Sequence, residues 1–207
     1  MPLRIAQCSV RAAAACRTAA AAWRQVPSCK SPQRRCVAAS AQQQSLARSV
    51  RPIPISVITV AKGNSKPAEA MAAEWADKLR RYTSLNEVNV KPNPKNARET
   101  AVAVAHEGER VLKALQPADR VVLLDERGRE LSSEEMAQLL AQASDQSWPS
   151  IVFCIGGPFG HAPAVRERAN DTVRLSKMVM NHQVAHVVLL EQLYRAWTIL
   201  RGEPYHH

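Results

Sequence analysis

The stretch Ile151-Val152-Phe153-Cys154-Ile155-Gly156-Gly157-Pro158-Phe159-Gly160 contains an apolar run that ends abruptly in a glycine loop. Five consecutive apolar residues predict a strand. A second apolar segment follows at residues 173–180, and a long helical pattern begins near residue 182. In α/β proteins, this succession of strand, glycine loop, strand and helix builds a ligand site at the strand ends.

The residues before this stretch alternate between strand patterns and helical patterns. Strands are predicted at residues 52–60, 85–90 and 121–125, with the strand at 85–90 near a sheet edge. Helices are predicted from Pro67 to about Tyr82, and after caps at Asn96 and Ser132. The first of these helices should bury Met71, Trp75, Leu79 and Tyr82. Because helix-length connections join the strands, we expect an α/β fold with a mostly parallel sheet.

The net charge of +10 is concentrated at the N-terminus of the chain. Residues 1–50 contain eight Lys or Arg and no acidic residue, which leaves 20 basic against 18 acidic residues in 51–207. The body is therefore almost neutral, and net charge alone does not indicate a nucleic-acid partner.

Residues 1–50 resemble an organelle transit peptide preceding a domain at 51–207. They are rich in Ala, Arg, Ser and Gln and lack the continuous apolar block of a secretory signal. The sequence Cys36-Val37-Ala38-Ala39 resembles the cleavage context of chloroplast precursors, which favours a chloroplast over a mitochondrion. A basic tail that stays attached and contacts RNA is the alternative. No apolar run approaches the length of a membrane span, so we expect no membrane association of the mature form.

Several common kinds of site are disfavoured by the motifs of the body. The glycine loop fits neither the dinucleotide fingerprint nor the phosphate-binding loop, and Pro158 lacks the N–H that a phosphate cradle needs. His182 and His186 have a spacing that could bind zinc, but Gln183 replaces the glutamate of a metalloprotease and no third ligand is evident. We therefore expect no metal. Cys154, the only cysteine after residue 50, is expected to act as a small buried hydrophobe.

Three motifs in the last third of the chain carry a specific resemblance. They are 155–160 (IGGPFG), 175–183 (LSKMVMNHQ), and 191–197 (EQLYRAW) followed by Pro204-Tyr205-His206. In order and spacing they resemble the ribosomal RNA large-subunit methyltransferase H family of the SPOUT class, and the resemblance covers about residues 53–207. Two departures stand out: Asn181 replaces a usual Pro, and His186 replaces a common Arg that could contact RNA phosphate.

The resemblance implies a C-terminal deep trefoil knot and a homodimer that binds S-adenosylmethionine. It also implies methylation of N3 of a pseudouridine in large-subunit ribosomal RNA, on the assembled ribosome. Matching positions assign cofactor binding to Leu124, Gly156, Gly157, Gly160, Leu175, Ser176, Lys177, Met178, Val179 and Met180. They assign catalysis or substrate positioning to Arg195, Tyr205 and His206.

The family's reaction requires a base, because N3 of a uracil-type base carries a proton that must leave. His206 is our candidate for that base, with Tyr205 orienting the substrate, and Glu191 is the alternative if it faces the site. A basic patch for RNA is expected from Lys91, Lys95, Arg98, Arg166, Arg168, Arg174 and Arg195. Two functions from other classes remain: a non-catalytic ribosome-associated factor with the same fold, and a nicotinamide-dependent enzyme.

Overall fold

The structure is a computed structural model that describes residues 50–92 and 100–204. The proposed transit peptide lies outside the described residues, apart from Val50, and so does the cap predicted at Asn96. Val50 and Ile53 are buried, so the chain joins the core before its first strand.

Strands and helices alternate along the described chain. The strands are β1 (Ile55–Val60), β2 (Leu85–Val90), β3 (Arg120–Glu130), β4 (Ile151–Ile155) and β5 (Asp171–Arg174). The helices are α2 (Lys66–Leu79), α3 (Thr100–Ala114), α4 (Ser133–Asp145), α5 (Pro163–Arg168) and α6 (His182–Arg201). The predicted strand–helix alternation is confirmed.

All strand pairs of the sheet are parallel, in the order β2-β1-β4-β3-β5. The α/β fold with a mostly parallel sheet is thus confirmed, and β2 lies at an edge as predicted. β4 is central and every one of its residues is buried, as expected for a strand covered on both faces. Because the strands are parallel, their carboxyl ends all meet at one edge of the sheet.

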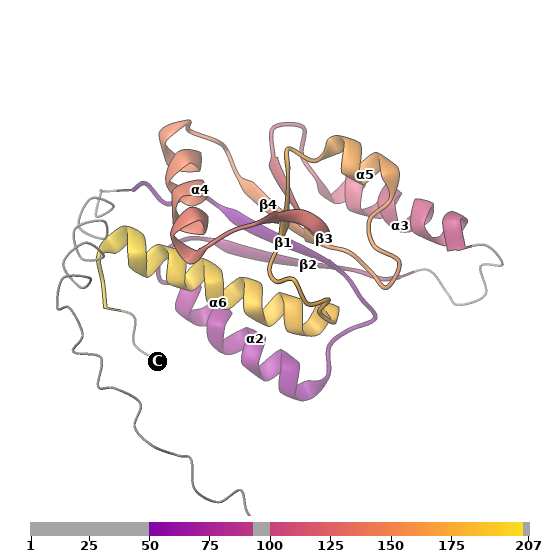
Figure 1. Ribbon diagram of the computed structural model, residues 1–207, viewed down its shortest axis with the longest axis horizontal. Coiled ribbons are helices and arrows are strands. Elements are labelled where there is room, and N and C mark those ends of the chain that lie inside the picture. The colour runs from indigo at the N-terminus through magenta and orange to yellow at the C-terminus, as the bar shows by residue number, and fades with distance from the viewer. Residues whose placement is uncertain (1–49, 93–99, 205–207) are drawn as a thin grey trace, which may run out of the picture. The chain divides into compact units, whose positions relative to one another are not determined.

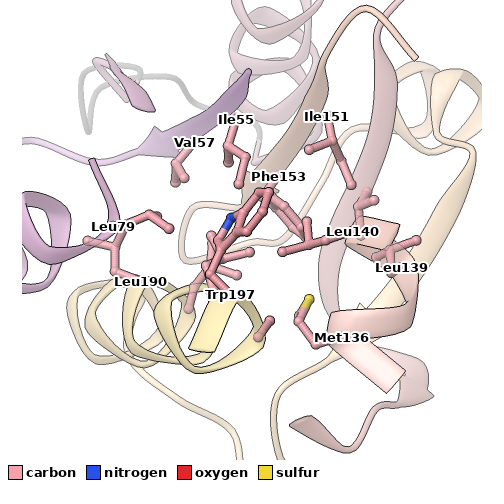
Figure 2. Packing of buried hydrophobic residues seen from close by; sticks show 14 of the residues in the cluster. Ile55, Val57, Leu79, Met136, Leu139, Leu140, Ile151, Phe153, Leu190 and Trp197 are labelled. Carbon is pink, nitrogen blue, oxygen red and sulfur yellow. The ribbon is translucent and has the colours of Figure 1, made fainter. Parts of the chain in front are cut away.

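Helices cover both faces of the sheet (Figure 1). Alternate residues of β4 explain this, because Phe153 enters the core with α2, α4 and α6, whereas Cys154 enters the core with α3 and α5. Figure 2 shows Phe153 and Trp197 packed together with Leu190 of α6 and Met136 of α4. The role predicted for Cys154 is confirmed, since its residue is 1 % exposed.

Local signals set the ends of α4 and α6. Ser132 accepts a hydrogen bond from the Glu135 amide while the Glu135 carboxylate accepts one from the Ser132 amide, so the predicted capping box is confirmed. Asn181 caps α6 through the Gln183 amide, and Gly202 ends this helix with φ 64°. A left-handed residue of this kind is usually glycine, because it has no Cβ.

Strand β3 is longer than the sequence indicates. The predicted strand stops at residue 125, but β3 continues to Glu130, with a register shift in which Val173 of β5 pairs with both Leu124 and Arg129. Gly128 allows this close approach: a Cβ there would lie 2.5 Å from the Val173 carbonyl carbon. The charged residues between Leu124 and Gly128 have the composition of a turn, and only pairing with β5 makes the segment a strand.

The buried face of α2 also differs from the prediction. Leu79 is fully buried, but Met71 is 54 % exposed and the core positions are Ala72 and Ala76. Small side chains let α2 pack closely beside α6, and the Trp75 and Tyr82 rings lie at the margin, each about 6 Å from the Tyr194 ring.

Within residues 50–92 and 100–204, no helix has the length and apolar character needed to span a bilayer.

Candidate functional site

A pocket of about 610 Å³ opens where β4 and β5 end, beside the middle of β3. Its walls come from three segments that lie far apart in the chain, namely 124–127, 155–161 and 174–182, together with Arg166 and Ala185. A volume of this size suits a small organic ligand. The carboxyl ends of parallel strands are also where open α/β sheets place their ligands.

The pocket brings together nearly all the positions that the family resemblance assigns to a cofactor. The lining includes Leu124, Gly156, Gly157, Gly160, Leu175, Ser176, Met178, Val179 and Met180. Lys177 is exposed and does not line the pocket. The two apolar segments and the glycine loop therefore form one site.

The glycine loop is a tight turn that forms one wall. The Gly160 amide donates to the Gly157 carbonyl at 3.0 Å, and Gly160 has φ 78°. A Cβ at Gly156 would lie 3.0 Å from the Gly160 carbonyl carbon and 3.2 Å from the His161 Nε2 atom. Glycine at position 156 thus lets the strand end pass directly beneath the turn.

A polar frame joins this loop to the middle of β3. The Arg166 guanidinium lies 2.7 Å from the Asp125 carboxylate, and its Nε donates to the His161 carbonyl at 3.3 Å. The other Asp125 oxygen accepts from the Arg127 amide at 3.0 Å. The His161 Nε2 lies 3.0 Å from the Leu124 carbonyl, and since a carbonyl only accepts, Nε2 carries the hydrogen.

The charge states of this frame follow from its surroundings. Burial acts to raise the pKa of Asp125, but the Arg127 amide and the Arg166 guanidinium outweigh it and hold the pKa below its ordinary value. Burial lowers the pKa of His161, against the opposing effect of the Leu124 carbonyl and Asp125. Near neutral pH, Asp125 is therefore charged and His161 is neutral. Asp125 is committed to the frame, so it is not available to a ligand.

Some pocket residues were not singled out from the sequence, among them Glu126 and His161. Glu126 is exposed and His161 is buried, and both line the pocket. Glu126 directly follows the strand predicted at 121–125, and His161 directly follows the glycine loop at 155–160. That proximity was the only signal in the sequence. His182, which was considered only as a metal ligand, also lines the pocket. Glu126 provides a carboxylate that can face a positively charged ligand.

The predicted catalytic residues lie apart from this pocket or outside the described chain. Tyr205 and His206 lie outside the described residues. Arg195 does not line the pocket: it lies on α6, roughly 15 Å along the helix axis from Ala185. Both its Nε and its terminal nitrogen donate to Glu191, at 3.0 and 2.7 Å. Glu191 does not line the pocket either.

His186 has a structural role that the sequence did not indicate. It is buried, and its Nε2 lies 3.2 Å from the Glu87 carboxylate of β2. The departure at position 186 therefore affects the packing of α6 against the sheet edge, and an RNA contact there is not supported. Because His182 lines the pocket and His186 faces Glu87, the two histidines have different surroundings.

The arginines expected to form a basic patch have partners within the chain. Arg166 and Arg174 pair with Asp125 and Glu130, and Arg168 donates to three carbonyls of the 116–119 turn. Lys95 and Arg98 lie outside the described residues. Arg168 in particular stabilises a turn, so it is a poor candidate for a phosphate contact.

Comparison with known proteins gives concordant results. Residues 53–206 match the family model described as "Predicted SPOUT methyltransferase". An Arabidopsis thaliana protein, provisionally named as an RNA methyltransferase, is 49 % identical over 77 % of this chain and 83 % of its own length. The ribosomal RNA large subunit methyltransferase H of Geotalea daltonii is 40 % identical over 74 % of this chain and 99 % of its own.

A solved structure, the A. aeolicus TrmH/SpoU tRNA modifying enzyme, aligns with a TM-score of 0.43 at 11 % identity, covering 81 % of this chain and 88 % of that one. At that score the likeness adds nothing to the assignment. The family model and the curated relatives suffice. The chain belongs to the SPOUT methyltransferases, in the family of the ribosomal RNA large-subunit methyltransferase H proteins.

Proposed function

We propose that this protein uses S-adenosylmethionine to methylate N3 of a pseudouridine in the large-subunit ribosomal RNA of an organelle ribosome. The observation that carries the proposal is the pocket at the strand ends, where the glycine loop and the segment after β5 converge on Leu124. The relatives named as ribosomal RNA methyltransferases support the choice of substrate class.

The residues of the pocket fit such a methyl donor. Its volume of about 610 Å³ lies in the range of small-molecule sites, and the glycines let backbone groups approach a ligand closely. When bound, S-adenosylmethionine supplies a methyl group on a positively charged sulfur, which is open to in-line attack. Glu126 offers a negative charge at the pocket, and Leu124, Leu175 and Met180 offer apolar contact.

The chain must also accept a proton, because N3 of pseudouridine loses one when it is methylated. We assign this role to His206 as general base, with Tyr205 and Arg195 positioning the RNA. Glu191 is a weaker candidate, because its carboxylate already accepts hydrogen bonds from Arg195 and Gln192. If His206→Ala methylates at the wild-type rate per bound ribosome, the assignment of the base is wrong.

We further propose that the protein is a homodimer. The rim of the pocket carries Met178 and Val179, which are 76 % and 79 % exposed, and Val184, which lies between the lining residues His182 and Ala185 in the chain, is 52 % exposed. Clustered apolar side chains of this kind usually meet a partner surface. A second copy would cover them. Sedimentation or light scattering of the purified chain tests this.

The family's trefoil knot is part of the same proposal. It is supported by the match of residues 53–206 to the SPOUT family model. Import into a chloroplast, with a mitochondrion as the alternative, is supported by the composition of residues 1–50 alone. Fluorescent fusions of residues 1–50 would show which organelle receives them.

Two measurements test the function directly. Calorimetry should detect binding of S-adenosylhomocysteine and no binding of NADH; the reverse result would favour a nicotinamide-dependent enzyme. Mass spectrometry of organelle ribosomal RNA nucleosides should then show loss of one methylated pseudouridine when the protein is absent. If S-adenosylhomocysteine binds but every methylated nucleoside persists, the protein is a non-catalytic ribosome-associated factor.

A further inference from the structure

His161 connects two segments of the pocket that are distant in the chain. Its imidazole belongs to the loop after β4, yet its Nε2 lies 3.0 Å from the carbonyl oxygen of Leu124 at the end of the regular part of β3. The same nitrogen lies 3.2 Å from the place where a Cβ on Gly156 would stand. The imidazole is therefore fixed between Leu124 and Gly156, both of which line the pocket.

The backbone of His161 is held as firmly as its side chain. Its carbonyl accepts from Arg166, which also binds the Asp125 carboxylate one residue after Leu124. A closed ring of contacts thus runs from Leu124 through His161 and Arg166 to Asp125. The residue as a whole is only 7 % exposed, so water competes little for these contacts.

The Leu124 carbonyl lies where the sheet becomes irregular. Pairing between β3 and β5 shifts register directly after Leu124, so the ladder does not continue regularly past this carbonyl. A side-chain donor reaches the carbonyl at that break. An apolar residue of similar size could fill the space of the imidazole, but it would leave the carbonyl without this donor.

From this geometry we infer that His161 is a positioning residue of the methyl-donor pocket, one that fixes the spacing between the Leu124 strand end and the Gly156–Gly160 turn. The inference rests on the proposed function for the identity of the ligand. His161 acts through Leu124 and Gly156, and the structure gives it no role in proton transfer. Losing its hydrogen bond should widen the pocket and weaken donor binding while the fold remains.

Two substitutions separate hydrogen bonding from space filling. His161→Gln keeps an N–H donor at a similar distance, whereas His161→Leu fills the space without a donor. A matched control is Val165→Ala, which removes buried volume from α5, four residues after His161 in the chain, without touching the pocket. Val165 is 1 % exposed, so this control lowers stability and leaves the His161 hydrogen bond in place.

Calorimetric titration of each full-length variant with S-adenosylhomocysteine is the test. We expect His161→Leu to raise Kd roughly tenfold, and His161→Gln and Val165→Ala to stay within about threefold of wild type. Thermal unfolding of every variant reports folding independently. If His161→Leu does not fold, His161→Asn takes its place, since its shorter side chain cannot reach the Leu124 carbonyl and it should show the same tenfold loss.

The outcomes distinguish the two proposals. Equal affinity of wild type and His161→Leu, or equal losses for Leu and Gln, would overturn the positioning role while leaving the donor pocket intact. A tenfold loss in Val165→Ala would likewise overturn it, because general loosening would then explain the effect. Failure of the wild type to bind S-adenosylhomocysteine would overturn the proposed function, and the positioning role with it.

Discussion

Gly128 offers the sharpest test of how the fold forms the pocket. It is buried within β3, where a Cβ would lie 2.5, 2.6 and 2.7 Å from the carbonyl carbon, nitrogen and Cα of Val173. These distances are about 1 Å inside the normal carbon contact distance. Gly128→Ala must therefore push the second part of β3 away from β5, because the colliding atoms are backbone atoms and cannot rotate aside.

The size of the effect follows from this collision. Overpacking a well-packed site costs about 1–3 kcal/mol, and a collision with backbone belongs at the upper end. Alanine also reduces the conformational entropy of the unfolded chain, which offsets about 0.4–1 kcal/mol of that loss of stability. We expect the free energy of unfolding to fall by about 2 kcal/mol, which corresponds to a Tm lower by about 4–8 °C in a domain of this size.

The prediction can be measured by urea unfolding followed through tryptophan fluorescence, since Trp197 lies in the core. Gly157→Ala is the matched control for stability. There a Cβ meets only side-chain atoms of Glu107 and Val60, both at 3.3 Å, so the loss should stay below about 1 kcal/mol. Gly128→Ala with wild-type stability, or with a loss no larger than that of Gly157→Ala, would show that β3 and β5 are not in close contact there.

Three further predictions concern pH, thiol reactivity and capping. The folded-state pKa of His161 is lowered, so protonation of this residue opposes folding. The free energy of unfolding, measured by urea titration, should therefore fall as the pH drops below about 6.5. Between pH 7 and 5 the free energy of unfolding of His161→Gln should fall less than that of the wild type. Asp125 does not confound this window, since its lowered pKa makes its contribution disappear only below about pH 3.8. Burial raises the pKa of Cys154 to about 12, with Asp119 adding to the effect, so peptide mapping after iodoacetamide treatment at pH 8 should find Cys154 unmodified in folded protein and alkylated in urea. Ser132→Ala should cost about 1 kcal/mol of unfolding free energy by removing the α4 cap; an unchanged urea midpoint would contradict the capping role.

The predictions that succeeded rest on local patterns whose physical cause is local as well. The apolar run 151–155 predicted a strand, and Ser132 predicted the start of a helix. These features depend on residues within one turn or one strand of each other, so local sequence patterns are sufficient to predict them.

The predictions that failed depend on partners far along the chain. The continuation of β3 to Glu130 depends on Val173 of β5, and the choice of Ala72 over Met71 for the core depends on where α6 packs. The hydrogen bond from His161 to Leu124 spans 37 residues and no local motif announces it. The composition of the pocket was recognised by family resemblance, but the contacts that hold its walls became visible only in three dimensions.

Gly128 and His161 affect the fold and the pocket in different ways. Gly128 lets β3 lie against β5, and the chain leaving β5 then supplies Leu175 to Met180 to the pocket, so a change at Gly128 should reduce stability and donor binding together. His161 joins two walls of the pocket through one side-chain hydrogen bond that is not part of the strand pairing. A change there should therefore reduce donor binding more than stability. If variants at Gly128 and at His161 lowered the free energy of unfolding and the donor affinity in the same proportion, the pocket could not be altered independently of the core. The contacts of these two residues instead predict that a change at Gly128 lowers both quantities, whereas a change at His161 lowers mainly the donor affinity.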